Sequence, residues 1–342
     1  LAKVGMGSGI IYLIGIGLLM MALNLMMGEI AAHTQKEMQL VSFARHYFGR
    51  AGEIIMTILM YVMLFGVMVI YIIGEGQTLS ALIGGTPFFW STVFYILISA
   101  LIIAGMRTIK TIELFLSLGI LAVVLLISLA SAPAVSGWNW TDLDLNLATL
   151  FLPYGVLLFA YHGVTSIPEA HTLLIRRDGA FKKAIISAGI ICMIVYTLFA
   201  LTVVGVTGKE TTEIATLGLG ERVPVVLFFG MGTSALMVGL SLRDSMRWDF
   251  QLPSWVSTLA VIAVPYLLFL LGKREFIATI DIVGGVFMSL QAILILAMFA
   301  KARAEKRAAK SKFGMAYTPA VGTIMLLAFL GGSIYTIVRL FT

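Results

Sequence analysis

The stretch Leu152–Leu173 reads LPYGVLLFAYHGVTSIPEAHTL and is apolar enough to reach membrane depth, yet it does not fit one uninterrupted helix. Pro153 and Pro168 bracket it, and Gly155 and Gly163 loosen it from within. Because proline and glycine are the residues that most often interrupt a helix, this stretch decides what kind of membrane fold the chain can form.

Pro168 determines where the interruption should fall. An interior proline removes one backbone hydrogen bond and clashes with the carbonyl four residues earlier, so the turn around Val164 should be disturbed. We therefore predict a helix break between Ala160 and Thr165. In hydrocarbon, freed backbone groups are tolerated only where they line a protein-enclosed or water-filled cavity. In transporters, that cavity is usually the substrate site.

The composition is that of a protein that crosses the membrane many times. Of the 342 residues, 60% are hydrophobic and 12% are charged, and the mean hydropathy is +1.03, whereas soluble domains have about 25% charged residues. A span needs roughly 20 apolar residues. Ten such runs occur, at about 6–32, 51–82, 88–105, 111–131, 147–173, 184–207, 223–242, 254–272, 276–300 and 319–341. We therefore predict an all-α integral membrane protein whose single transmembrane domain covers residues 1–342.

The distribution of basic residues predicts the orientation of these spans. Seventeen of the 23 lysines and arginines fall on one side of the membrane when the spans alternate. Because cytoplasmic loops carry the excess of Lys and Arg, this side is expected to be cytoplasmic and the membrane to be the plasma (cytoplasmic) membrane. The net charge of +6 is explained by this asymmetry, so no nucleic-acid partner is expected beside the lipid bilayer.

The chain opens with Leu1 instead of Met and enters its first span after a few residues. Either a cleaved leader or an upstream helix would place this end outside. We expect an upstream helix, which raises the number of spans from ten to eleven. The oligomeric state is not predicted.

Three of the acidic residues in the predicted spans need an explanation. Glu29 is expected at the cytoplasmic interface, and Asp281 is expected to pair with Lys273 or Arg274. Glu75 has two interpretations: a residue hydrated by headgroups near the outer end of its span, or a functional carboxylate. The functional interpretation arises because a charged side chain at the centre of a membrane helix costs a few kcal/mol and usually marks a functional site.

The run FFGMGTSALMVGLSL contains Gly230 followed by Thr233 and Ser234, whose hydroxyls are expected at mid-membrane depth. Such hydroxyls often bond back to a carbonyl of their own helix. They are also oxygen ligands that could hold Na⁺ together with carbonyls of an unwound neighbour. The residues alone leave both interpretations open.

Several motifs together resemble a known family. They are FAYHGVTSIPE with the basic loop after it, the helix start KKAI, the outer loop GVTGKETTE and the Thr-Ser pair two helices later. These resemble the amino acid permeases of the amino acid/auxin permease family, which belongs to the amino acid, polyamine and organocation superfamily. The resemblance covers nearly the whole chain. It implies a leucine-transporter-like inverted-repeat bundle, in which the spans present are family helices two to eleven.

The resemblance also implies the site. Broken helices one and six hold the amino acid in this fold, so the chain as written contains half of that site. The implied substrate-binding residues are Phe159, which covers the substrate, and the unwound turn Ala160, Tyr161, His162 and Gly163. The implied ion-coupling residues are Thr233 and Ser234, with Gly230 before them. The coupling ion is H⁺ or Na⁺, because proton-coupled members carry such hydroxyls too.

His162 has two interpretations. Because histidine titrates near neutral pH, it could carry the coupling proton, or it could stay neutral and bond to loose backbone.

The predicted function is secondary active import of a neutral, aromatic or branched amino acid by alternating access. The alternative is a membrane amino acid sensor that does not transport. No enzyme is expected, because the four histidines show no metal-type spacing and no G-x-S-x-G occurs. The single cysteine, Cys192, excludes an intramolecular disulfide and a cysteine metal site, and no cofactor is predicted.

Overall fold

The structure is a computed structural model of the chain. It describes residues 4–34, 38–104, 118–119, 121–122, 124–129, 131, 151–208, 211–212, 214, 224–272, 274–305, 311–314 and 319–341.

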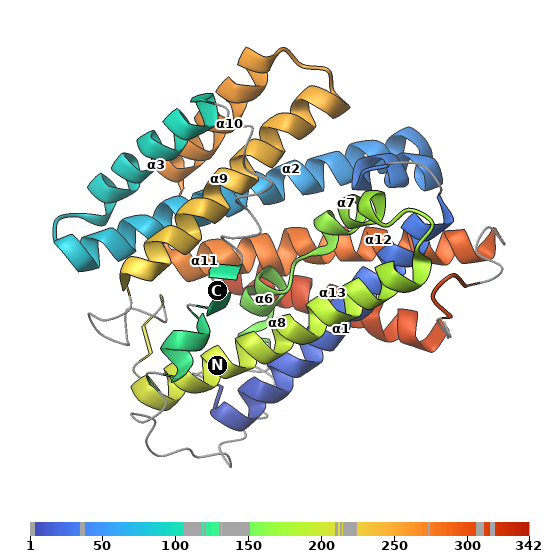
Figure 1. Cartoon of the computed structure of the whole chain (residues 1–342), viewed down its shortest axis with the longest axis horizontal. Helices are drawn as coiled ribbons and strands as arrows, with labels where there is room; N and C mark the ends of the chain where they lie inside the picture. Colours follow the sequence, from blue (N-terminus) through green and yellow to red (C-terminus); the bar gives the residue numbers. More distant parts are fainter. Residues whose placement is uncertain are drawn as a thin grey trace. The chain divides into compact units, whose positions relative to one another are not determined.

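The secondary structure assigned to these residues is helical (Figure 1). The α-helices are α1 (Met6–His33), α2 (Leu40–Ile83), α3 (Pro87–Ala104), α6 (Tyr154–Ala160), α7 (Ile167–Leu173), α8 (Asp178–Thr207), α9 (Pro224–Asp249), α10 (Ser254–Leu271), α11 (Phe276–Asp281), α12 (Ser289–Ala304) and α13 (Pro319–Phe341). A 3₁₀ turn, η2 (Val164–Ser166), precedes α7, and a π-helix, η5 (Ile282–Met288), joins α11 to α12.

Seven spans within the described ranges are long and apolar enough to cross a membrane. They are α1, α2, α3, α8, α10, the continuous stretch Phe276–Ala304 and Pro319–Leu340. Large apolar side chains face outward on them: Ile11, Ile96 and Ile324 are 64%, 64% and 65% exposed. Such a surface suits acyl chains and not water, so the chain is an integral membrane protein.

The other three predicted spans have different outcomes. The run 111–131 is described only in part, at 118–119, 121–122, 124–129 and 131, and the run 147–173 is divided among α6, η2 and α7. Helix α9 covers the run 223–242. The count of ten spans therefore stays a prediction.

Contacts divide the chain into two compact units, and each is taken by itself. The first unit comprises Leu1–Gly7, Met63–Leu143 and Leu198–Ile280, and the second comprises Ser8–Val62, Asp144–Thr197 and Asp281–Thr342. Helix α2 contributes to both. It bends at Gly49, whose φ of 64° is a left-handed value that favours glycine. The single domain over residues 1–342 stays a prediction.

In the first unit, α3, α9, α10 and the Met63–Ile83 half of α2 pack together, and α3 lies beside α10 (Figure 1). The Tyr95 hydroxyl donates a 2.6 Å hydrogen bond to the carbonyl of Ile262 on α10. The Arg243 guanidinium on α9 donates a 2.8 Å bond to the carbonyl of Ile102 at the end of α3. These bonds connect helices that lie far apart in the sequence.

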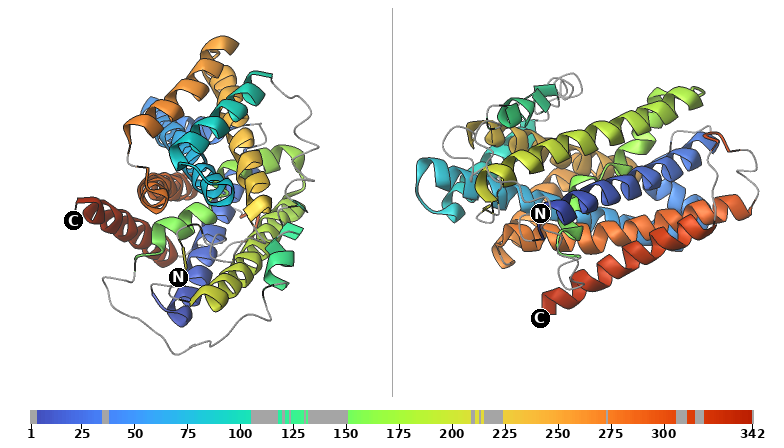
Figure 2. Two further views of the ribbon diagram at one scale, coloured as in Figure 1. Left: turned by 90° about the vertical axis from the view of Figure 1, so that its left-hand side faces the viewer. Right: turned by 90° about the horizontal axis from the view of Figure 1, so that it is seen from below.

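In the second unit, α1 and α8 run side by side (Figures 1 and 2). Small residues allow this close packing: a Cβ added at Gly17 would lie 2.7 Å from Cγ of Met193, and one added at Gly189 would lie 3.0 Å from Cγ of Met21. The glycines of these two helices therefore allow α1 and α8 to approach closely.

Glu29 is not an interface residue, and that prediction was wrong. Its side chain is 1% exposed, and its two carboxylate oxygens accept hydrogen bonds of 2.9 Å from the backbone amides of Lys312 and Phe313. His33 lies 3.3 Å from the carboxylate and Arg303 lies 3.9 Å from it. Glu29 therefore fastens the segment before α13 onto α1.

Asp281 was also assigned the wrong partner. Its carboxylate accepts a 3.0 Å hydrogen bond from the guanidinium of Arg339 on α13, whereas Arg274 bonds to the carbonyls of Phe269 and Leu270, and Lys273 lies outside the described residues. The aspartate is 8% exposed. The pair therefore connects the start of η5 to the C-terminal helix.

Candidate functional site

The broken helix is present where the sequence predicted it. Helix α6 ends at Ala160, no helix is assigned from Tyr161 to Gly163, and the 3₁₀ turn η2 then leads into α7. Pro168 occupies the first turn of α7, where a missing backbone N–H needs no partner. The proline thus separates two short helices instead of kinking one long helix.

The first half of the broken helix is held by glycines. A Cβ added at Gly155 would lie 2.9 Å from Cα of Asp281, and one added at Gly284 would collide with the carbonyl of Gly155. The backbones of α6 and η5 therefore touch directly. The Tyr154 hydroxyl adds a 2.8 Å hydrogen bond to Ser289, and its ring fills the space left by Gly332. Helix α6 is thus a fixed support for the turn.

The break frees backbone groups, and one of them is satisfied by a neighbouring helix. The carbonyl of Ala160 accepts a 2.9 Å hydrogen bond from the Tyr196 hydroxyl on α8. The rings of Tyr161 and Tyr196 meet edge to face with centroids 5.1 Å apart. A Cβ added at Gly17 would lie 3.0 Å from the Tyr161 ring. The turn therefore lies between α1 and α8, with two aromatic rings beside it.

Polar atoms at the turn are buried without hydrogen bonds. Within the described ranges, no partner is found for either imidazole nitrogen of His162, for the Tyr161 hydroxyl or for Oδ1 of Asn24. Asn24 belongs beside the turn, because a Cβ added at Gly163 would lie 3.8 Å from its Nδ2. Buried polar groups are normally satisfied, so this cluster is suited to a polar ligand.

Two predicted substrate residues lie at the end of α6, just before the turn. The side chain of Ala160 is exposed, and that of Phe159 is half-buried. The Cβ of Phe159 lies 3.2 Å from the position that a Cβ at Gly284 would occupy, so this residue stands between the turn and η5. The role of Phe159 as a cover for the substrate stays a prediction.

Asn24 was not predicted as a site residue. The signal that could have found it is a polar side chain within an apolar span, which often marks a functional site. Its approach to Gly163 joins positions far apart in the sequence, and no local pattern reports that contact.

The predicted ion-coupling residues belong to the other unit. Gly230, Thr233 and Ser234 all lie on α9, which is helical throughout Pro224–Asp249. Thr233 and Ser234 are half-buried, and Ser234 is hydrogen-bonded to the hydroxyl of Tyr71 on α2. The side-chain surroundings of Gly230 lie outside the described residues. The predicted substrate residues therefore lie in the second unit and the predicted ion-coupling residues lie in the first.

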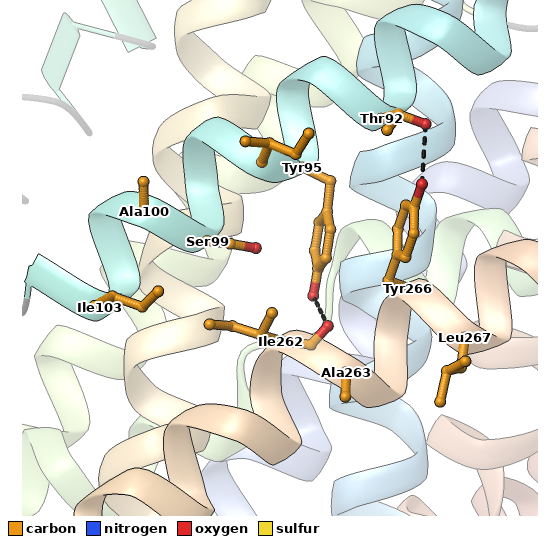
Figure 3. Close-up of a pocket in the computed structure, with 10 residues that line it drawn as sticks. Thr92, Tyr95, Ser99, Ala100, Ile103, Ile262, Ala263, Tyr266 and Leu267 are labelled. Atoms are coloured by element: carbon orange, nitrogen blue, oxygen red, sulfur yellow. Dashed lines mark hydrogen bonds between the residues drawn. The ribbon is translucent and has the colours of Figure 1, made fainter.

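An apolar groove lies between α3 and α10 of the first unit (Figure 3). Its volume is about 600 Å³, and none of the predicted site residues lines it. The rings of Tyr95 and Tyr266 stack at 5.2 Å, and their hydroxyls bond to Ile262 and Thr92. Since these hydroxyls are already paired, the groove suits apolar chains better than the charged ends of an amino acid.

Comparisons with known proteins agree with these observations. Residues 1–242 match the family described as transmembrane amino acid transporter protein. The chain is 26% identical over 336 residues to Tyrosine-specific transport system 1 of Haemophilus influenzae, which covers 88% of this chain and 82% of that protein. It is 25% identical over 186 residues to Amino acid transporter AVT1B of Arabidopsis thaliana, covering 51% of this chain and 34% of that protein.

The fold is similar to that of MhsT, solved in complex with L-phenylalanine. The TM-score is 0.63 at 13% sequence identity, over 98% of this chain and 92% of that chain. The predicted leucine-transporter-like fold is therefore confirmed.

Proposed function

Because this chain belongs to the transmembrane amino acid transporter family, we propose that it imports a neutral aromatic amino acid, with tyrosine as the first candidate, by ion-coupled alternating access. The family predicted from the sequence is confirmed, and so is the prediction that the protein is a transporter and not an enzyme. The relatives are named as transporters and not as enzymes. The substrate, the coupling ion and the direction of transport belong to the proposal.

The observation that carries this proposal is the unwound turn Tyr161–Gly163 with its buried polar atoms. An amino acid presents an ammonium and a carboxylate group, and both need partners when they leave water. The side-chain oxygen of Asn24 accepts hydrogen bonds, and the nitrogens of His162 can donate or accept. Unwound backbone at membrane depth adds further donors and acceptors.

The aromatic residues around the turn support an aromatic substrate. Tyr161 and Tyr196 already form an edge-to-face pair, and Phe159 lies two residues before Tyr161 in the chain. Aromatic pairs contribute beyond their buried area. The name of the Haemophilus influenzae relative and the phenylalanine bound to MhsT favour the same class of substrate.

We place the protein in the plasma membrane with its main basic loops in the cytoplasm. This orientation rests on the asymmetry of Lys and Arg in the sequence.

The test is uptake of labelled tyrosine by the full-length protein in proteoliposomes, with each common amino acid as competitor. We expect tyrosine and phenylalanine to compete and charged amino acids not to compete. Tyr161→Leu should raise KM about fivefold, because one aromatic contact is worth about 1 kcal/mol, whereas Tyr161→Phe keeps the ring and should change KM less. Uptake that prefers charged amino acids would overturn the proposed substrate, and binding without uptake would indicate a sensor.

A further inference from the structure

Glu75 is a buried carboxylate of the first unit that has no side-chain partner among the described residues. It lies on α2 with 0% of its surface exposed, so headgroup water does not reach it. Neither carboxylate oxygen has a side-chain hydrogen-bond partner among the described residues, and no described cation forms an ion pair with it; the backbone of Gly232 is the polar group that approaches it. The carboxylate faces the backbone of Gly232 on α9.

The described side chains of the helices packed around Glu75 supply no charge to balance it. On α2 itself, the nearest titratable group is Tyr71, whose hydroxyl is bonded to Ser234 of α9. The described cations of α9, Arg243 and Arg247, lie far along that helix and pair with Asp244.

The remaining neighbours are uncharged. The α11 residue at this contact is Phe276, whose ring lies against Gly74. The α3 residue is Ser91, which donates a 2.8 Å hydrogen bond to the carbonyl of Ile72. Thr78, one turn along α2, donates its hydrogen bond to the carbonyl of Gly74. The neighbouring hydroxyls are therefore already in use.

An ionised carboxylate in this place is costly, and binding a proton or a metal cation removes the charge. A metal cation needs several oxygen ligands. Here α2 and α9 are continuous helices, so their carbonyls are used in helical hydrogen bonds. The neighbouring side-chain hydroxyls are paired as well. A proton needs only the carboxylate itself.

We propose that Glu75 carries the proton that drives substrate uptake. In the conformation seen here its carboxyl is neutral. The O–H bond forms with a proton taken from water on one side of the membrane and breaks when a second conformation exposes the group to water on the other side. One proton crosses per cycle, and no oxidation or reduction occurs.

This role rests on the proposed transport function and sharpens it. The contact with Gly232 lies next to the predicted coupling residues Thr233 and Ser234 on α9. A change of charge at Glu75 would therefore act directly on the helix that carries them.

The test compares the wild type with Glu75→Gln in proteoliposomes of the full-length protein under an imposed pH gradient without Na⁺. With about one unit of pH gradient and one proton per substrate, coupling permits about tenfold accumulation of tyrosine. We expect this accumulation in the wild type and none in Glu75→Gln. The matched control is Glu53→Gln on the same helix, because Glu53 pairs with Arg45 at the surface. This control should accumulate tyrosine like the wild type.

The outcomes separate the two proposals. If the wild type transports no amino acid under any gradient, the proposed function fails. If the wild type accumulates tyrosine and Glu75→Gln responds to the pH gradient equally well, or if only Na⁺ drives uptake, the role of Glu75 fails.

A second measurement applies even if Glu75→Gln does not fold. The infrared carbonyl band of a protonated carboxylic acid should appear in the wild type, should persist with a shifted position in Glu75→Asp, and should disappear when turnover is driven toward the releasing side. A wild type that shows no such buried band contradicts the proposal.

Discussion

Glu29 and Glu75 are both glutamates on membrane helices with almost no exposed surface, one in each unit, and their surroundings are opposite. The Glu29 carboxylate accepts hydrogen bonds from two backbone amides and lies beside Arg303 and His33. Glu75 has no side-chain partner among the described residues, and the backbone of Gly232 is the polar group that approaches it. A buried charge is tolerated when it is paired and hydrogen-bonded, so the first residue holds the fold together and the second is available for function.

The same division separates other polar groups of the second unit. Oδ2 of Asp281 is paired with Arg339 at 3.0 Å, although its Oδ1 has no hydrogen-bond partner among the described residues, and Tyr154 is paired with Ser289 at 2.8 Å. Asn24, Tyr161 and His162 at the unwound turn hold buried atoms without partners. Substitutions of the paired group should therefore lower stability, whereas substitutions of the unpaired group should lower transport and leave stability nearly unchanged.

The largest loss of stability is expected for Glu29→Gln. The substitution removes the negative charge near Arg303. It also places the side-chain NH₂ donor of glutamine opposite one of the two backbone N–H groups that now donate to the carboxylate. The free energy of unfolding should fall by about 3 kcal/mol, measured by denaturant unfolding in mixed micelles. Glu305→Gln is the control, because Glu305 is in an accessible pair with Lys301 at 3.9 Å and should change stability by less than about 1 kcal/mol. If Glu29→Gln and Glu305→Gln lowered the free energy of unfolding equally, the structural role assigned to Glu29 would be contradicted.

A smaller loss is expected for Tyr154→Phe. The ring still fills the space at Gly332, but the hydrogen bond to Ser289 is lost. Ser289 keeps its 2.7 Å bond to the carbonyl of Gly285, so the cost should be about 1 kcal/mol in the same unfolding measurement. A cost as large as that of Glu29→Gln would mean that the α6–η5 contact depends on this hydroxyl more than on its glycines.

The break in the helix was predictable because its causes are local. Pro168 acts on the four residues before it, and Gly163 lies within the turn itself. The residues that interrupt the helix are therefore all found in the stretch that is interrupted. The π-helix was not predictable. Gly284 and Gly285 lie against Gly155 and Thr336, which leave no room for a side chain. Because those residues lie far away in the sequence, the two glycines alone do not predict a π-helix.

The errors at charged residues have the same origin. Asp281 was paired with Lys273 or Arg274 because those cations are close in the sequence, whereas its partner Arg339 is 58 residues away. Glu29 was placed at the interface because its amide partners, Lys312 and Phe313, lie more than 280 residues further along the chain. A sequence shows that a carboxylate is in a span but does not show which distant group neutralises it.

The most direct test of the substrate site is Asn24→Leu in the full-length protein, with tyrosine uptake and unfolding measured on the same preparation. Leucine has the same number and branching of side-chain heavy atoms as asparagine, and methyl groups replace the two polar atoms. We expect uptake to fall about tenfold, the value of one hydrogen bond to a charged group of the substrate, while the free energy of unfolding stays within about 0.5 kcal/mol of the wild type. Unchanged uptake, or a loss of stability like that of Glu29→Gln, would contradict the assignment of the turn as the site of transport.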